Sequence, residues 1–133
     1  MAGACEQQRG EESRGAASGD GYSQRPIRPS TASAQVKPCG LRPDGTLPDD
    51  FAEEARQAWR NVAEALGAAG AQLTDIVSVR QWLTSADDIP VYAAVRSEVI
   101  KHELTFMLGV LSGLVWPQIR VEIEVTAVRP ARG

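Results

Sequence analysis

The chain has 133 residues, of which 43% are hydrophobic and 23% are charged, and its formal net charge at pH 7 is -3. This length suits one domain, and the mildly acidic charge without a lysine or arginine cluster gives no reason to expect nucleic acid as a partner. The uncharged and mostly apolar run at residues 104–116 is too short to span a bilayer. The composition thus argues against a nucleic-acid-binding protein and against a membrane protein.

Two features predict a cytoplasmic location. The first residues lack the basic and apolar regions of a secretory signal. Two cysteines, Cys5 and Cys39, are too few for the disulfide framework of a small secreted domain, which suits a reducing compartment.

The first third of the chain is poorly patterned. Residues 1–20 are rich in Gly, Ala, Ser, Glu, Gln and Arg, which predicts a disordered tail before a single domain over residues 21–133. Five of the eight prolines fall within residues 21–48, and proline cannot donate to a strand ladder. We therefore expect at most short strands around residues 34–36 and 39–42, with a turn at residues 43–46.

Residues 49–69 are predicted to form the first helix. Asp49 or Asp50 can cap it, and Glu53 and Glu54 suit its positive end and lie on its predicted polar face. Apolar side chains recur at spacings of three and four: Phe51, Ala55, Ala58, Trp59, Val62 and Leu66. Gly70 can end the helix because glycine takes the left-handed conformation without penalty. We expect this helix to lie across a sheet.

An alternating strand should follow from residue 76 to 83. The pattern places Val77, Val79, Gln81 and Leu83 on one face. It places Ile76, Ser78, Arg80 and Trp82 on the other.

A second helix should begin near Pro90 and run to about Lys101, with either Val91 or Tyr92 facing inward beside Val95 and Val99. His102, the only histidine, is expected to complement the dipole at the end of this helix.

Two further strands are predicted. The nearly continuous apolar run at residues 104–111 is typical of a strand that is covered on both faces. The second strand alternates, with the residues Ile119, Val121, Ile123, Val125 and Ala127 on its inner face. Arg120, Glu122, Glu124 and Thr126 are predicted on its outer face.

The sheet face away from the helices would carry Trp82, Arg80 and part of residues 106–111, which is too apolar for comfortable exposure. We therefore expect an oligomer that packs through its sheets.

The sequence contains no phosphate loop, dinucleotide fingerprint, zinc-ligand spacing or nucleophile elbow, so we expect no cofactor and no metal. Glu122 and Glu124 are the only carboxylates on a predicted rigid strand beside an apolar surface, where a raised pKa is possible. An ordinary solvated strand face is the alternative interpretation of these two residues.

The residues in this order resemble the RidA family, also called YjgF/YER057c/UK114 or L-PSP endoribonuclease. The resemblance covers about residues 21–129 and is carried by Ala-Gly-Ala-Gln-Leu-Thr-Asp-Ile-Val (residues 69–77) and Val-Glu-Ile-Glu-Val-Thr-Ala-Val (residues 121–128). It implies an α+β, chorismate-mutase-like subunit in which a mixed sheet carries two helices on one face. It also implies a homotrimer with small-molecule sites in the clefts between subunits.

The best-known members of this family hydrolyse imines or enamines derived from amino acids. By resemblance, Glu122 matches the glutamate that positions or activates water, and Tyr22 matches a substrate-binding aromatic residue. Thr105 stands where the family has an arginine that binds the substrate carboxylate, and Ala93 aligns with an asparagine. A neutral hydroxyl cannot replace the charge-assisted contact of a guanidinium.

Three functions follow from these observations. Retained Glu122 and Tyr22 favour a divergent hydrolase of deaminase type that acts on a small imine, enamine or related metabolite without a carboxylate in the usual place. The missing arginine favours a non-catalytic trimer that binds or senses a small metabolite, so whether the chain is an enzyme stays open at this point. RNA cleavage ranks last, because the net charge is negative and no suitable His/Lys/Glu set is visible.

Overall fold

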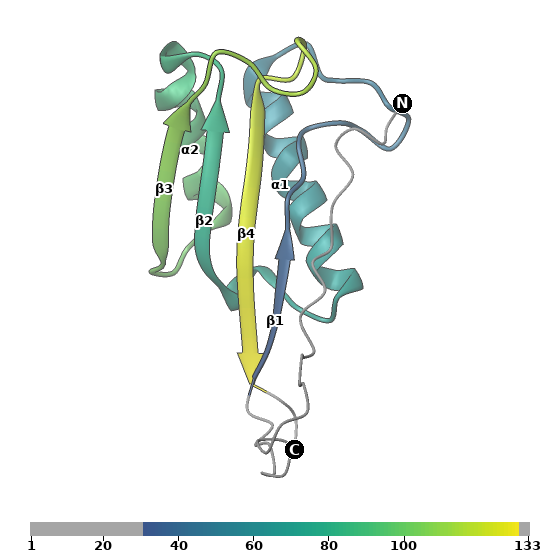
Figure 1. Ribbon diagram of the computed structural model, residues 1–133, viewed down its shortest axis with the longest axis vertical. Coiled ribbons are helices and arrows are strands. Elements are labelled where there is room, and N and C mark those ends of the chain that lie inside the picture. Colours follow the sequence, from purple (N-terminus) through teal and green to yellow (C-terminus); the bar gives the residue numbers. More distant parts are fainter. Residues whose placement is uncertain (1–30, 131–133) are drawn as a thin grey trace, which may run out of the picture.

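A mixed sheet with two helices behind it makes up the described part of the computed structural model, residues 31–130 (Figure 1). The strands are β1 (Thr31–Val36), β2 (Ile76–Leu83), β3 (Thr105–Val110) and β4 (Val121–Pro130), and the helices are α1 (Phe51–Ala68) and α2 (Ile89–Val99). The strand order is β1-β4-β2-β3. The β1–β4 and β4–β2 pairs are antiparallel, and β2 runs parallel to β3 through the crossover helix α2.

This architecture confirms the predicted α+β class with both helices on one face. Residues 1–30, which include the predicted tail and Tyr22, lie outside the described residues. The strand expected near residues 34–36 is present as β1. No strand forms at residues 39–42, where only Cys39 makes an isolated bridge, to Glu122 on β4.

The first helix begins and ends as its sequence predicts. Asp50 caps it, because its side chain accepts a hydrogen bond from the backbone N–H of Glu53 at 3.2 Å. At the other end Gly70 has a φ of 81°, and the N–H groups of Gly70 and Ala71 donate to the carbonyls of Gly67 and Leu66. This pair of bonds is a Schellman motif, which satisfies the last helical carbonyls and turns the chain toward β2.

The prediction for Glu54 was wrong. Its side chain is fully buried, and Oε1 accepts from Nε of Arg120 at 2.7 Å while Oε2 accepts from the backbone N–H of Arg120 at 2.9 Å. Arg120 also donates through Nη2 to the carbonyls of Pro48 and Asp49. Arg120 therefore reaches the N-terminus of α1, and it does not lie on the outer sheet face with Glu122 as its position in the alternation predicted.

Strand β2 follows its predicted alternation only from residue 78 onward. Val79, Gln81 and Leu83 are buried, but Ile76 is 1% exposed and Val77 is 47% exposed, which is the reverse of the prediction. The register between β2 and β4 shifts between Ile76 and Ser78. Such a bulge adds one residue to the strand, and this extra residue inverts the faces before it.

Helix α2 packs through Tyr92 and Val95, so Tyr92 rather than Val91 is the inward residue. Tyr92 Oη donates to Oε1 of the buried Gln81 at 2.7 Å, and Gln81 Nε2 donates to the Met107 carbonyl at 2.8 Å. The hydrogen bonds thus connect α2 to the edge strand β3 across β2. His102 lies beyond the end of the helix, and its Nε2 is 2.9 Å from the carbonyl oxygen of Ile76.

Strands β3 and β4 differ in how well the pattern predicted them. β4 alternates as expected, and its inner residues from Val121 to Ala127 are buried against the helices. β3 is an edge strand with exposed Phe106, Met107 and Val110, so the prediction that it is covered on both faces is wrong for a single chain.

The core lies between the helices and the inner sheet face. Its largest fully buried apolar side chains are Trp59, Leu66, Ile76, Leu83 and Ile123, together with Tyr92. In the described part of the chain, no helix has the length and apolar character that a membrane span requires.

Candidate functional site

Glu122 lies on the open face of the sheet, near one end of β4. Its partner on β2 is Trp82, and Cys39 lies opposite it on the other side. The backbone N–H of Ile123 donates to the Pro38 carbonyl at 3.0 Å, which holds the segment after β1 against β4. The carboxylate is therefore carried by a rigid strand with ordered chain on both sides.

Three effects act on the protonation of Glu122. Partial burial, the largest, raises the pKa of its carboxyl above the ordinary value of 4.5, and the negative charge of Glu124 raises it further. The positive charge of Lys37 lowers this pKa. Because burial prevails, Glu122 is a better proton acceptor than an exposed glutamate.

The neighbour of Glu122 on β2 is an aromatic residue, Trp82, whose indole ring extends over the strand on its other side, β3. Trp82 is half-buried, and it is paired with Gly109 on the neighbouring strand β3. A Cβ atom built on Gly109 would lie 2.9 Å from the ring of Trp82, so the ring lies directly over this glycine. Gly109 thus lets the indole lie flat along the open face.

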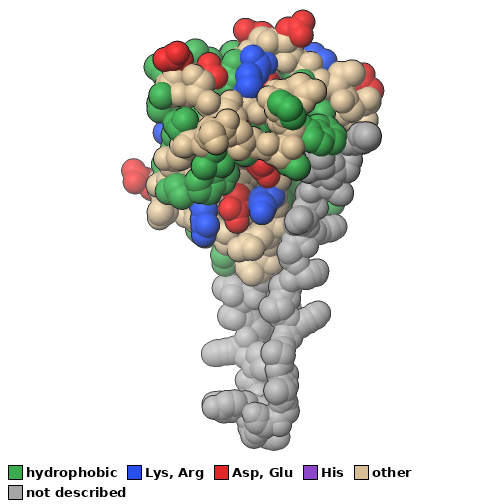
Figure 2. Space-filling view, turned by 45° about the horizontal axis from the view of Figure 1, so that its top comes forward, with side chains coloured by type: hydrophobic (Ala, Val, Ile, Leu, Met, Phe, Trp, Pro, Cys, Tyr) green, Lys and Arg blue, Asp and Glu red, His purple; other side chains and the backbone are tan. Residues whose placement is uncertain are grey.

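Charged groups of both signs gather on the open face. Figure 2 shows acidic side chains between basic ones, surrounded by hydrophobic and uncharged surface. Arg80 on β2 is paired with Glu124 on β4, and Nη1 of Arg80 lies 4.0 Å from Oε1 of Glu124. Arg80 is thus on this face, whereas Arg120 is bound to Glu54.

Thr105 and Glu122 do not meet within one chain. Thr105 pairs with Ser78 on β2, whereas Glu122 pairs with Trp82, four residues further along the same strand. Four strand residues span about 13 Å. Ala93 is half-buried on α2, behind the sheet, and Tyr22 lies outside the described residues. The four positions singled out by the resemblance therefore do not form a site within residues 31–130.

Sequence reasoning missed Lys37. This lysine is exposed and follows β1 directly, in the proline-rich segment that carries no clear pattern. Its proximity to Glu122 follows from the β1–β4 register, which the sequence of this segment does not reveal.

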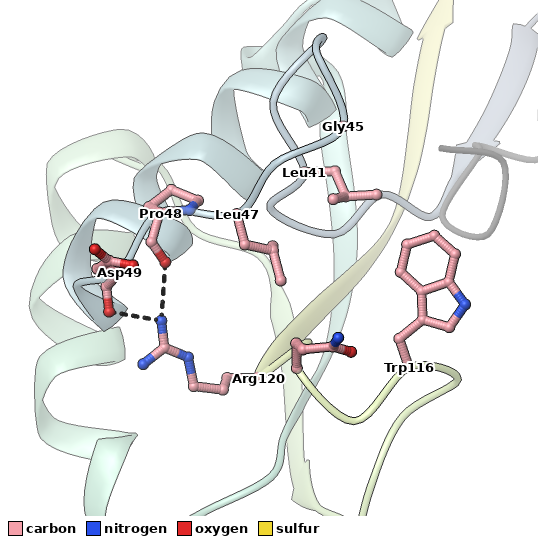
Figure 3. Close-up of a pocket in the computed structure, with 8 residues that line it drawn as sticks. Leu41, Gly45, Leu47, Pro48, Asp49, Trp116 and Arg120 are labelled. Atoms are coloured by element: carbon pink, nitrogen blue, oxygen red, sulfur yellow. Dashed lines mark hydrogen bonds between the residues drawn. The ribbon is translucent and has the colours of Figure 1, made fainter. Parts of the chain in front are cut away.

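A depression lies away from Glu122, at the end of the sheet where the loops before α1 and β4 meet (Figure 3). It has a volume of about 420 Å³. Its lining residues are Leu41, Gly45, Leu47, Pro48, Asp49, Trp116, Gln118 and Arg120. Because Arg120 binds Glu54 and two backbone carbonyls there, this guanidinium holds the loop in place (Figure 3).

Within residues 31–130 no group of three or more His, Cys, Asp or Glu side chains could hold a metal ion. The chemistry available at the open face is that of two carboxylates (Glu122 and Glu124), an ammonium group (Lys37), a guanidinium (Arg80) and the aromatic side chain of Trp82.

The family model for endoribonuclease L-PSP matches residues 20–129. The chain belongs to this family. It is the RidA, or YjgF/YER057c/UK114, family that the sequence resembles, and many solved structures share its fold. No curated protein sequence matches the chain.

Three solved structures illustrate the likeness. Rv2704 from Mycobacterium tuberculosis, a member of the YjgF/YER057c/UK114 family, is 29% identical with a TM-score of 0.65, covering 77% of this chain and 80% of its own. TdcF from E. coli, solved with bound serine, is 23% identical with a TM-score of 0.68, and the match covers 79% of this chain and 89% of TdcF. The YjgF gene product of E. coli is 24% identical with a TM-score of 0.67, and the match covers 78% of this chain and 88% of the YjgF product. Both E. coli structures share the fold of this chain.

Proposed function

We propose that this RidA-family chain hydrolyses small imines or their enamine tautomers, a reaction of deaminase type, with Glu122 as the residue that activates water. The observation that carries the proposal is the position of Glu122, which is half-buried on a rigid strand opposite Trp82, with a pKa that burial raises. Such a carboxylate can accept a proton from water near neutral pH.

The reaction needs only water as a second reactant. The substrate is the imine with its nitrogen already protonated. Glu122 takes a proton from the attacking water as the water oxygen bonds to the imine carbon, which gives a neutral carbinolamine. Glu122 then returns this proton to the amino nitrogen, the C–N bond breaks and ammonia leaves, while the hydroxyl group passes its proton to solvent water and becomes the carbonyl.

The proposed site lies in a cleft between subunits of a homotrimer. The open sheet face supports an assembly, because Met107 is 42% exposed there and Trp82 is only half-buried. Thr105 is separated from the Glu122 of its own chain, as expected if a neighbouring subunit completes the site. TdcF, which shares the fold, holds serine, which supports a small polar molecule as the ligand.

One observation favours a second function. Thr105 stands in place of the family's carboxylate-binding arginine, and a chain without this group could bind a metabolite without turning it over. In this alternative the trimer is a small-molecule sensor or carrier. RNA cleavage has weaker support, because the net charge is -3 and the ring of His102 contacts a backbone carbonyl.

Purified protein should be assayed with imines generated in situ from several amino acids by an amino acid oxidase. Release of 2-oxo acid should exceed the buffer rate, and Glu122→Gln should remove this excess. Glu124→Gln is the matched control, because it lies two residues away on the same strand and face and should retain most of the rate.

An equal loss in both variants would contradict the role of Glu122. Absence of hydrolysis together with a ligand-dependent rise in melting temperature would instead establish the binding function.

A further inference from the structure

We propose that Lys37 binds the substrate carboxylate, in place of the arginine that this chain lacks. This inference rests on the proposed function and names the charge that would select its substrates, which are small imines with a carboxylate and the corresponding 2-oxo acids.

The strand register determines where Lys37 lies. Val36 pairs with Val125, and three residues further along Cys39 pairs with Glu122, so the register is unbroken. Lys37 is therefore opposite Glu124, and Glu122 occupies the diagonal position on the same face. Diagonal neighbours on an antiparallel pair are about 7–8 Å apart at their Cα atoms, within the reach of a lysine side chain.

The charge of Lys37 is available to a ligand. Within the described residues it forms no ion pair, and its side chain is exposed. Its charge nonetheless reaches Glu122, whose pKa it lowers. Arg80 lies near Glu124, and Arg120 is bound by Glu54. Lys37 is in neither ion pair, so its ammonium group is the positive charge beside Glu122 that remains available to a ligand.

This arrangement can hold a small imino acid in one orientation. The ammonium of Lys37 would bind the carboxylate, the adjacent imine carbon would face water held by Glu122, and the substrate side chain would lie toward Trp82. An ammonium is a point charge on a flexible stem, whereas a guanidinium is a rigid bidentate donor. We therefore expect looser geometric selection than an arginine gives, with the requirement for a carboxylate retained.

Binding of 2-oxobutanoate, measured by calorimetry on the intact protein, tests this inference without requiring turnover. Lys37→Met should weaken the affinity by about tenfold or more, since a charge-assisted contact is lost. Lys37→Arg should retain most of it. The matched control is Lys101→Met, which removes the same charge from the far end of α2, where this lysine donates to the Ser97 carbonyl. The neutral 2-oxobutanamide should bind wild type and Lys37→Met equally.

Each remaining outcome is decisive. Unchanged affinity in Lys37→Met, or no binding of 2-oxobutanoate by the wild type, would overturn the role of Lys37. If imines are hydrolysed but Lys37→Met keeps the wild-type KM, this inference fails and the proposed hydrolase stands. If Lys37-dependent binding occurs without hydrolysis, the hydrolase fails and the lysine remains the carboxylate clamp of a binding protein.

Discussion

Glu54 and Arg120 form an ion pair in which both carboxylate oxygens of the glutamate accept hydrogen bonds from the same, partly exposed arginine, at 2.7 and 2.9 Å. Glu54 is completely buried, and Arg120 also donates to two carbonyls just before α1. The pair therefore fixes the start of β4 against the N-terminus of α1, two residues before Glu122.

Removing one member of this pair should destabilise the fold strongly. Glu54→Ala leaves the guanidinium without its carboxylate, and we expect a loss of about 3 kcal/mol in the free energy of unfolding, measured by urea denaturation. The double variant Glu54→Met/Arg120→Met replaces both charges by apolar groups and should recover a large part of this loss. A double variant as unstable as the sum of its single variants would contradict the coupling.

The hydrogen bond from Tyr92 to Gln81 gives a second prediction. Tyr92→Phe leaves one acceptor of the buried Gln81 without this donor and should cost about 1–2 kcal/mol in urea denaturation. Ser97→Ala, on the exposed side of the same helix, should cost much less. Equal costs would show that the buried bond contributes nothing.

Tyr92 also predicts a loss of stability at alkaline pH. Burial raises the pKa of its hydroxyl far above the ordinary value of 10.0, so the folded state keeps a proton that the unfolded state releases. The stabilising contribution is present below pH 10 and falls as the pH rises above it. Melting temperatures measured between pH 9 and about 11 should therefore fall more steeply for the wild type than for Tyr92→Phe. Parallel curves would contradict the raised pKa.

Sequence patterns predicted the elements better than the contacts between them. Asp50 and Gly70 bound the first helix because capping depends on neighbouring residues. Glu54 was misplaced because its partner is 66 residues away, and helical periodicity places a charge on the polar face by default. Val77 was misplaced because a bulge depends on pairing with another strand.

The candidate site was predicted only in part for the same reason. Glu122 could be found because β4 alternates cleanly and carries a recognisable motif. Lys37 could not, since its segment has no periodicity and its relation to Glu122 exists only through the β1–β4 register. Arg120 looked like an outer-face residue, because alternation does not show that its side chain turns toward α1.

The proposed trimer can be tested by placing a charge on the open sheet face. Met107→Asp puts a carboxylate on β3 opposite Arg80 and should dissociate the assembly while preserving the fold. Val91→Asp is the matched control, since Val91 on α2 is 41% exposed and Met107 is 42% exposed. Light scattering should give the trimer mass for the control and a monomer mass for Met107→Asp. Equal masses would show that subunits do not pack through this face.

Glu122 gives a pH dependence whose sign follows from its burial. Burial raises the pKa of its carboxyl in the folded state above the ordinary value of 4.5, which applies to the unfolded state. Between these two pKa values the folded state still holds a proton that the unfolded state has lost. This group therefore contributes stability at acid pH and loses that contribution as the pH rises through its folded pKa. Hydrolysis needs the deprotonated form, so the rate should fall on acidification with an apparent pKa above 4.5.

Removing the nearby positive charge should move this titration further. Lys37→Met deletes the group that lowers the pKa of Glu122, so the carboxyl resonance of Glu122 should titrate at higher pH in this variant than in the wild type. Carbon-detected NMR on carboxyl-labelled protein measures the shift, with Glu122→Gln to assign the resonance and Lys101→Met as the charge-matched control. Identical titration curves for wild type and Lys37→Met would show that the ammonium lies too far from the carboxylate to share a ligand with it.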